Sequence, residues 1–396
     1  MTFSKCNLLV CIAACGFLIL GRFSGFLLWY WIPLVLLTLM QMQTQSRETA
    51  LRSNPAWLLL LACLCLTPDL SDDVHRYLWE GYVQTQGYSP YQHSPESLYE
   101  VLDHPSEGLV NNGDLTAIYP PLAQYLFRLA ATLSATLVGW KLLLASLLLF
   151  FLFHPVGRAS FPWLFAPLVL FEGFWNSHLD LLGLVPGFLL VAALRDKKPF
   201  AVGFCLALMT AFKLLPVLLL PTCMLYFKRG SWPRLLLGFF PFLILTYLPY
   251  LSQGMALFDS FLTFSRHWHF NNLLFPLFDA VLPPDGVRPA LAICLIITIV
   301  AVTLSKRDVV DRCAFIWIAL FVFSPTFFPW YLIWLVPFIQ SGKQAFLHLA
   351  YAASFFSYLI LIPYRASGVW AEHWAWLLPE WLVLYACFYA ICRRTR

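Results

Sequence analysis

Residues 199–227 read PFAVGFCLALMTAFKLLPVLLLPTCMLYF, and this stretch decides the class of the fold. It holds one charged side chain, Lys213, yet it is longer than the about 20 apolar residues that a helix needs to cross a bilayer. Prolines interrupt it, so we interpret it as a pair of helices or as one broken helix. The stretch 313–340 has the same character and receives the same interpretation.

The composition of the whole chain agrees with this stretch. Of its 396 residues, 60% are apolar, 17% are aromatic and only 11% are charged, whereas a soluble protein is about 25% charged. These values exclude a soluble domain of this length and a disordered chain. The net charge of +5 is too thinly spread for a nucleic-acid-binding surface. We expect an all-α, polytopic transmembrane helical bundle that forms a single domain over residues 1–396.

Other apolar runs follow one another along the chain with short polar segments between them. Together they predict about 10 to 14 membrane helices, with 161–171 and 273–282 as re-entrant or interfacial pieces. Residues 12–15 (IAAC) are typical of a lipoprotein cleavage site, but so many spans follow that we expect an uncleaved first membrane helix. The runs are 7–21, 26–40, 55–67, 119–138, 141–153, 161–171, 179–194, 232–251, 273–282, 290–304, 344–363 and 377–392.

Charge predicts the orientation, because Lys and Arg near membrane ends mark the cytoplasmic side. A cytoplasmic N-terminus gathers most of the basic residues on that side. The longest polar segment, 68–118, holds nine carboxylates and one basic residue, Arg76, so we expect a large first outer loop there. The residues expected inside are Lys5, Arg47, Arg52, Lys141, Arg195, Lys197, Lys198, Lys228, Arg229, Arg234, Lys306, Arg307, Arg312, Lys343, Arg393, Arg394 and Arg396, with Glu48, Asp196, Asp308 and Asp311 as the only carboxylates among them.

The first polar cluster is SDDVHRYLWEG at 71–81. A helix from Asp73 would put Asp73, Arg76, Tyr77 and Glu80 on one stripe, and the free amides at its start would stabilise the ionised carboxylate. A solvated helix cap followed by an interfacial turn is the alternative.

Two further clusters place polar groups against apolar runs, where charge is costly. Residues 172–180 carry Glu172, Asn176, His178 and Asp180; a surface loop is the alternative explanation. Lys213 either holds an anionic headgroup or extends its ammonium to the interface.

The fourth cluster, SRHWHFNN at 265–272, mixes cations with aromatic rings. Arg266, His267, Trp268 and Asn271 are suited to stacking on a sugar and holding a phosphate, although an interfacial aromatic belt has a similar composition. Together the clusters indicate sugar transfer from a lipid phosphate. This reaction needs one carboxylate to deprotonate the acceptor hydroxyl and cations to stabilise the leaving phosphate, and direct displacement inverts the anomeric centre.

At these residues the chain resembles the GT-C superfamily of polytopic glycosyltransferases. It is most similar to glycosyltransferase family 87 and to related polyprenyl-phosphate-mannose-dependent mannosyltransferases. One departure is Phe328, because relatives often have a histidine before the Pro-Trp-Tyr motif. The matching motifs, in chain order, are Asp72-Asp73-Val74-His75-Arg76-Tyr77, Gly87-Tyr88-Ser89-Pro90-Tyr91, Tyr119-Pro120-Pro121, His178-Leu179-Asp180, Lys213-Leu214-Leu215-Pro216, Trp268-His269-Phe270-Asn271 and Pro329-Trp330-Tyr331.

The resemblance implies transfer of a hexose, with mannose as the first candidate, from a polyprenyl-phosphate donor to a glycan or glycolipid acceptor at the outer face of a bacterial inner membrane. It implies cytoplasmic termini, membrane lipids as surroundings and no nucleic-acid partner. The expected base is Asp73, with Asp72 as its rival, in the outer catalytic loop at about 68–118. The expected substrate-binding residues are Arg76, Tyr77, Glu80, Glu172, His178, Asp180, Lys213, Arg266, His267, Trp268 and Asn271, of which Lys213, Arg266 and Arg76 hold the phosphate.

Two other functions fit the same residues. A transporter or flippase of a charged lipid would also need charges in the membrane and broken helices. A non-catalytic assembly subunit would not need Lys213 and the acidic loop to converge. A divalent ion beside Asp72, Asp73 and His75 is a further alternative, but we expect no metal and no cofactor.

Overall fold

The computed structural model describes residues 3–44 and 56–393. The basic residues Arg47, Arg52, Arg394 and Arg396 and the acidic Glu48 lie outside these ranges. Within them the chain is helical, and its only β-type pairing is an isolated bridge between Phe270 and Thr326. The all-α prediction is therefore confirmed for this part of the chain.

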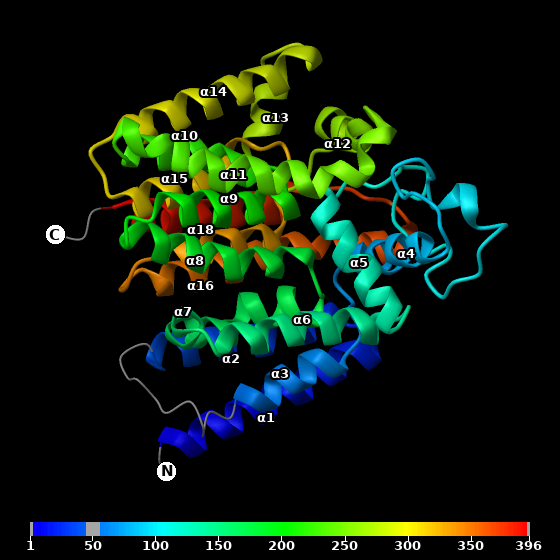
Figure 1. Ribbon diagram of the computed structural model, residues 1–396. Helices are drawn as coiled ribbons and strands as arrows, with labels where there is room; N and C mark the ends of the chain where they lie inside the picture. The colour runs from blue at the N-terminus through cyan, green and yellow to red at the C-terminus, as the bar shows by residue number, and fades with distance from the viewer. Residues whose placement is uncertain (1–2, 45–55, 394–396) are drawn as a thin grey trace.

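Most α-helices follow the predicted apolar runs in order, whereas α4, α7 and α12 lie outside those runs (Figure 1). They are α1 (Phe3–Ser24), α2 (Trp31–Thr44), α3 (Ala56–Cys65), α4 (Asp73–Thr85), α5 (Pro121–Leu133), α6 (Leu137–Leu152), α7 (Pro155–Ser160), α8 (Leu184–Arg195), α9 (Pro199–Phe212), α10 (Leu220–Tyr226), α11 (Trp232–Tyr247), α12 (Ala256–His267), α13 (Leu274–Asp279), α14 (Pro284–Leu304), α15 (Val309–Phe323), α16 (Gln344–Ser354), α17 (Leu361–Ser367) and α18 (Trp374–Cys392).

Short helices of other types join or interrupt them. All are 3-10 helices except η5, which is a π-helix. They are η1 (Leu27–Tyr30), η3 (Glu96–Leu98), η4 (Phe161–Phe165), η5 (Val169–Trp175), η6 (Leu179–Gly183), η7 (Leu215–Leu219), η8 (Arg229–Ser231), η9 (Leu248–Gln253), η10 (Pro329–Phe338) and η11 (Phe355–Ile360).

The two long proline-containing runs are broken, as predicted. In 199–227, α9 ends at Phe212, Lys213 is extended, and η7 follows with Pro216 near its start. In 313–340, α15 ends at Phe323 and η10 begins at Pro329. Pro216 lies four residues after the end of α9, and Pro325 lies two residues after the end of α15. Proline has no N–H and restricts the residue before it, so neither run continues as an α-helix through its proline.

In the part of the chain that the structure describes, four helical segments are long and apolar enough to cross a membrane: Arg229–Gln253, Pro284–Leu304, Gln344–Ser367 and Trp374–Cys392. Two bent pairs, one on either side of residues 134–136 and one on either side of residues 176–178, raise this number to six if each pair forms one span. The long apolar helices indicate a membrane-spanning protein. The shorter apolar helices are Leu8–Ser24, Leu27–Met40, Pro199–Phe212, Leu215–Tyr226 and Pro329–Phe338, and the expected 10 to 14 crossings depend on them.

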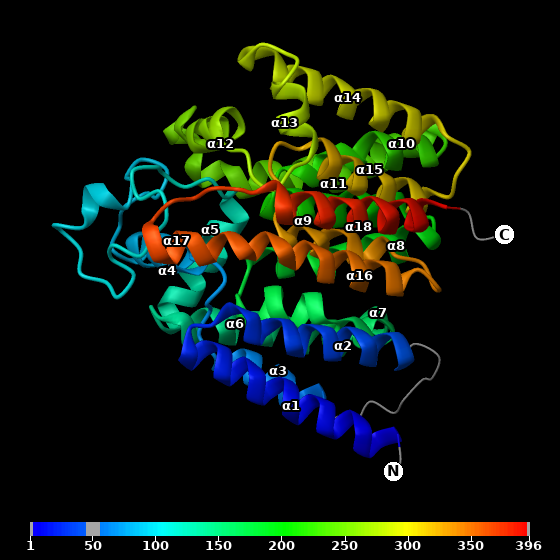
Figure 2. The same cartoon turned by 180° about the vertical axis from the view of Figure 1, so that it is seen from behind.

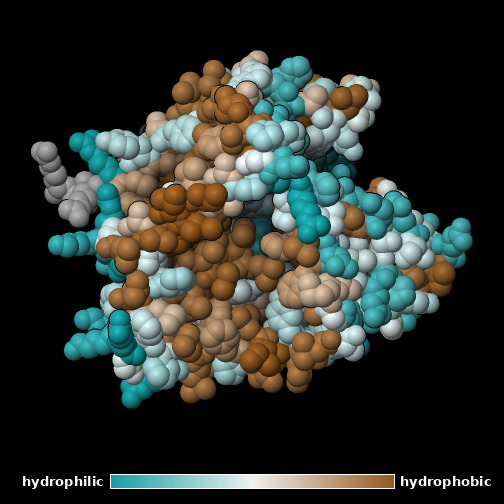
Figure 3. Space-filling model, turned by 90° about the horizontal axis from the view of Figure 1, so that it is seen from above, coloured by the Kyte–Doolittle hydropathy of each residue, from teal (hydrophilic) through white to brown (hydrophobic). Residues whose placement is uncertain are grey.

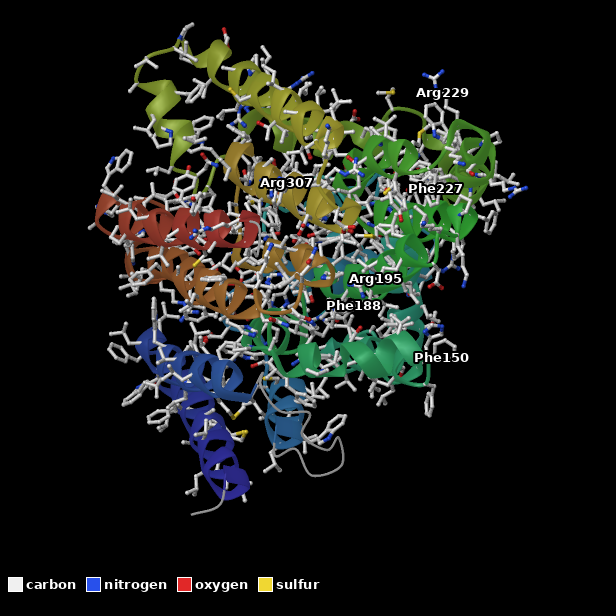
Figure 4. The ribbon with its side chains drawn as sticks, turned by 90° about the vertical axis from the view of Figure 1, so that its left-hand side faces the viewer. Phe150, Phe188, Arg195, Phe227, Arg229 and Arg307 are labelled. Atoms are coloured by element: carbon white, nitrogen blue, oxygen red, sulfur yellow. The ribbon has the colours of Figure 1, made fainter. Side chains whose placement is uncertain are left out.

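The molecule has two different ends. Most long helices run side by side, and the segment after α4 projects beyond them at one end, while α1 begins and α18 ends toward the other (Figures 1 and 2). An apolar surface lies between the two polar ends (Figure 3). The end opposite the projecting segment carries Arg195, Arg229 and Arg307 (Figure 4). This arrangement separates the basic end from the acidic 68–118 segment.

Lys141 departs from the expected distribution of charge. Its ammonium is buried and donates to the carbonyls of Cys63 and Leu66, at 2.7 and 2.5 Å. These carbonyls lie at the end of α3 that leads into the 68–118 segment. Unpaired carbonyls at a helix C-terminus attract a cation. Lys141 therefore lies next to the acidic 68–118 segment and not at the end that carries Arg195, Arg229 and Arg307.

Candidate functional site

A cavity of about 200 Å³ lies where the 68–118 segment meets the helices. Its wall comes from the start of α4, residues 111–120, the break at Lys213, helix α12 and the start of η10. Segments far apart in the sequence therefore form one site. The side chains most relevant to its chemistry are Asp73, Arg76, Asn111, Tyr119, Lys213, Ser260, Phe261, Phe264, Trp268, Phe328, Trp330 and Tyr331.

Asp73 is the carboxylate of this cavity. It is the first residue of α4, where the Ser71 hydroxyl accepts a hydrogen bond from its backbone N–H. Its Oδ1 accepts a hydrogen bond of 3.0 Å from the Asn111 side chain. Burial raises the pKa of the Asp73 carboxyl above its usual value, and the charge of Asp180 adds to this, while Asn111, Lys213 and Arg76 oppose it. A carboxylate with a raised pKa is well suited to accept a proton.

Asp72 occupies a different environment. It precedes α4, its side chain makes no capping hydrogen bond, it is exposed, and it does not line the cavity. The side chains of the two adjacent aspartates therefore lie in different surroundings, because successive residues at a helix start point in different directions.

Directly behind Asp73 lies His178, which is fully buried. Its Nδ1 is 3.8 Å from Oδ2 of Asp73, and its Nε2 is 3.5 Å from Oε2 of Glu172. Neither ring nitrogen makes a hydrogen bond in the described part of the chain. Glu172 is held by the hydroxyls of Tyr351 and Tyr358, each at 2.8 Å. Asp73, His178 and Glu172 therefore form a line from the cavity into the core.

Lys213 supplies the cation of the cavity. Its ammonium lies 2.8 Å from Oδ1 of Asp180 and 3.9 Å from the ring centroid of Tyr331. Asp180 also accepts a hydrogen bond of 2.5 Å from the Trp334 indole. The Lys213 side chain is 18% exposed, so the ammonium is stabilised from within and still faces the cavity.

Arg76 also lines the cavity, but its guanidinium is already bonded. It forms an ion pair of 3.2 Å with Glu80 and donates to the carbonyls of Asn111 and Asn112 at 2.6 and 2.7 Å. Two further carbonyls, of Leu115 and Thr116, accept from it. Arg76 thus fastens the 111–116 segment to α4. Glu80 is buried with it and accepts from Gln124 at 2.6 Å, away from the cavity.

Tyr77 is buried behind the wall of the first cavity. Its ring stacks on Phe127 with centroids 4.9 Å apart, and its hydroxyl is 3.5 Å from the backbone N–H of Leu179. The predicted stripe of α4 therefore exists, and its members divide between the cavity wall and the packing behind it.

The fourth predicted cluster is split by the structure. Trp268 stacks on Phe264 with centroids 5.6 Å apart, and both rings line the cavity. Arg266 and His267 are exposed and do not line it. Asn271 is buried elsewhere, where its side chain donates to Glu380 at 2.7 Å and its backbone N–H donates to Glu372.

A second cavity, of about 260 Å³, adjoins the first and shares Lys213, Leu215 and Tyr331 with it. It lies along α14 and α15 and is mainly apolar. Arg288 lines it and donates to the carbonyls of Ser265 and Trp268, at 3.0 and 2.9 Å. The remaining residues of its wall are Ser265, Leu291, Ala292, Leu295, Trp317, Leu320, Phe321, Phe323, Ser324, Pro325 and Trp334.

The structure thus gathers part of the predicted set. Asp73, Arg76, Lys213 and Trp268 line the first cavity, and Tyr77, Glu172, His178 and Asp180 lie behind its wall. Asp72, Glu80, Arg266, His267 and Asn271 lie outside it. Sequence reasoning missed Asn111, Tyr331 and Arg288. Tyr331 stands in a quoted motif, whereas Asn111 and Arg288 carry no local signal. Among the described residues, no group of three or more His, Cys, Asp or Glu side chains could hold a metal ion.

No protein-family model matches this chain, and no curated protein matches it.

Proposed function

We propose that the protein is an integral membrane glycosyltransferase of the GT-C type. It transfers a hexose, with mannose as the first candidate, from a polyprenyl-phosphate donor to an acceptor hydroxyl, with inversion. The observation that carries this proposal is one cavity that holds the Asp73 carboxylate, the Lys213 ammonium and several aromatic rings, beside a second, apolar cavity.

The base in this proposal is Asp73. Its carboxylate removes the proton of the acceptor hydroxyl, and the oxygen attacks the anomeric carbon from the side opposite the phosphate. The bond between that carbon and the phosphate oxygen breaks, and the polyprenyl phosphate leaves with the electron pair. Exposure of Asp72 outside the cavity favours Asp73 over its neighbour.

The donor phosphate is held by Lys213 and Arg288 in this proposal. Each lines the apolar cavity, and Lys213 lines both cavities. A Lys ammonium has three donors, so Lys213 can bond a phosphate oxygen while it keeps Asp180. The two cations expected beside it take other roles: Arg76 fastens the outer segment, and Arg266 is exposed at the surface.

The lipid tail then lies in the apolar cavity along α14 and α15, and the sugar lies in the first cavity. Trp268, Phe264 and Tyr331 offer ring faces on which a hexose can stack. The acceptor, a glycan or glycolipid, approaches from the 68–118 segment. Two remaining expectations belong to the same proposal: 10 to 14 crossings, and a bacterial inner membrane with cytoplasmic termini.

The test is incubation of the purified protein with a panel of radiolabelled polyprenyl-phosphate hexoses and lipid acceptors. The proposal expects loss of label from one donor, an inverted glycosidic linkage in the product, and no need for a nucleotide sugar. Label that crosses the bilayer of a proteoliposome unchanged would instead identify a flippase. Absence of both product and movement with every donor of the panel would overturn the proposal.

A further inference from the structure

We propose that His178 acts on the transfer through Asp73: it orients the Asp73 carboxylate and takes up the proton that Asp73 removes, while Glu172 holds the imidazole in place. This inference rests on the proposed function, because it assigns a positioning residue to the base of that reaction. It differs from the expectation that His178 contacts substrate, since His178 is fully buried and does not line the cavity.

The ring of His178 is fixed by stacking. It packs on Trp330 with centroids 3.9 Å apart and an interplanar angle of 18°, and Trp330 packs on Phe328 at 4.3 Å and 9°. Phe328 and Trp330 line the cavity, so the stack leads from the cavity wall to His178. Stacking fixes the plane of the imidazole and thereby the directions in which its two nitrogens point.

Each nitrogen faces one carboxylate. Nδ1 lies 3.8 Å from Asp73 and Nε2 lies 3.5 Å from Glu172, and neither has another hydrogen-bond partner among the described residues. A buried nitrogen without a partner is costly, so the arrangement calls for use of both nitrogens. Catalytic hydrogen bonds are often long before substrate binds, and separate movements of less than about 1 Å at each nitrogen would close the two gaps.

Glu172 is the fixed end of this line. The hydroxyls of Tyr351 in α16 and Tyr358 in η11 each donate to it at 2.8 Å, and the Asn176 side chain donates at 3.3 Å. These three donors leave the Glu172 carboxylate no freedom to turn away from His178. Glu172 therefore fixes the orientation of His178, and His178 in turn fixes the orientation of the Asp73 carboxylate.

The proton balance is simple. When Asp73 takes the proton of the acceptor hydroxyl, that proton moves to Nδ1 of a neutral His178 that carries its hydrogen on Nε2. The imidazolium then donates to Asp73 through Nδ1 and to Glu172 through Nε2, and Asp73 is again ionised. No oxidant, reductant or other reactant is needed.

Other charged and titratable groups also face Asp73, and the test must separate them from His178. Asp180 lies on η6, Lys213 at the break after α9, and Arg76 on the same helix as Asp73. The hydroxyls of Tyr77, Tyr119 and Tyr331 lie near it as well. All of these remain in place when only the ring at position 178 is changed.

The experiment measures the ionisation of Asp73 without any substrate. Dicyclohexylcarbodiimide modifies protonated carboxyls in apolar surroundings, and mass spectrometry of the Asp73 peptide gives the labelled fraction at each pH. In His178→Phe the flat ring keeps the stack on Trp330 but loses both nitrogens. The midpoint of Asp73 labelling should move to higher pH by about one unit, because Asp73 then keeps the proton that His178 would otherwise take up. His178→Gln, which keeps an N–H, should move it less.

A matched control is available in His348, a buried histidine of α16 near Trp163. His348→Phe removes an imidazole from the same protein and should leave the midpoint unchanged. An equal midpoint in wild type, His178→Phe and His178→Gln would overturn the inference. So would an equal shift in His348→Phe, since it would indicate a general effect of substitution in the core.

The transferase assay separates this inference from the proposed function. In an active enzyme, His178→Phe should lower kcat about 100-fold and leave KM for the donor unchanged. Normal transfer by His178→Phe would overturn the inference and leave the function intact. If the labelling midpoint shifted in His178→Phe but the wild-type protein transferred no sugar, the proposed function would be overturned and the link between His178 and Asp73 would be upheld.

Discussion

Lys213 and Asp180 form an ion pair of 2.8 Å that joins the break in the longest apolar run of the chain to η6. The break in the helix makes this ion pair possible. Because α9 ends at Phe212, the extended residue 213 can direct its side chain to η6 instead of to lipid. The pair is completed by the Trp334 indole on Asp180 and the Tyr331 ring under Lys213. A single charge in an apolar run is therefore compensated inside the protein and exposed to the cavity at the same time.

Lys213→Ala should weaken both stability and donor binding. Removal of one partner from a buried pair costs about 3–5 kcal/mol because the other charge is left alone. Asp180 is 2% exposed and would be that charge. Thermal unfolding in detergent measures the stability, and titration with polyprenyl phosphate measures an expected loss of about tenfold or more in affinity. Lys213→Arg, which keeps the charge, is the control. Unchanged affinity in Lys213→Ala would remove Lys213 from the phosphate site.

Arg288→Gln should reduce the affinity for polyprenyl phosphate about tenfold, because Arg288 lines the apolar cavity beside Lys213. Arg266→Gln is its matched control, since Arg266 lies on neighbouring α12 but is exposed outside both cavities. Binding is measured with the lipid phosphate in detergent micelles, with a neutral polyprenol as the reference ligand. If Arg266→Gln weakened binding and Arg288→Gln did not, the phosphate would be held at the surface.

Asp73→Asn should lower the rate of sugar transfer by about 10²–10⁴-fold while the protein still inserts and folds. The amide keeps the size of the side chain but cannot accept the acceptor proton. Asp72→Asn should retain nearly the full rate, because Asp72 lies outside the cavity. Transfer rates of both variants are compared at equal amounts of folded protein. Wild-type transfer by Asp73→Asn, or by the variant with both substitutions, would refute the assignment of the base.

The pH dependence of transfer should report the environment of Asp73. Burial raises the pKa of this carboxyl, and only its ionised form accepts a proton, so kcat/KM should fall on acidification at a higher pH than an ordinary aspartate would give. Asn111 donates to the ionised form and lowers the pKa, so Asn111→Ala should move the acidic limb to still higher pH. The limb is measured from about pH 4 to pH 8. A limb that moved to lower pH in Asn111→Ala would contradict this picture.

Most of the apolar helices could be predicted from the sequence, because a membrane imposes length and apolarity on the segments that cross it. The start of α4 at Asp73 and the breaks after residues 212 and 323 followed from local chemistry, a carboxylate at a helix start and prolines within apolar runs. These features need only neighbouring residues.

The contacts of the site could not be predicted in the same way. Asp73 and His178 lie 105 residues apart, and Asn111 reaches Asp73 from an irregular segment. Arg76 was expected to hold a phosphate together with Lys213 and Arg266, but carbonyl groups of the 68–118 segment already bond it. Backbone carbonyls carry no signature in a sequence, so competition from them is invisible before the fold is known.

Arg76→Lys should release the 86–118 segment from α4. A guanidinium reaches five acceptors at once in this structure, namely Glu80 and the carbonyls of residues 111, 112, 115 and 116, whereas an ammonium has three donors in another geometry. Because the pair with Glu80 is buried, the loss of well-matched contacts should destabilise the segment and expose residues 86–118 to protease. Limited proteolysis of the protein in proteoliposomes, with cleavage sites read by mass spectrometry, measures this exposure. Arg128→Lys, at an exposed position on α5, should leave the cleavage pattern of wild type. If Arg76→Lys resisted protease as wild type does but bound polyprenyl phosphate more weakly, the role of Arg76 would be to bind the phosphate and not to hold residues 86–118 against α4.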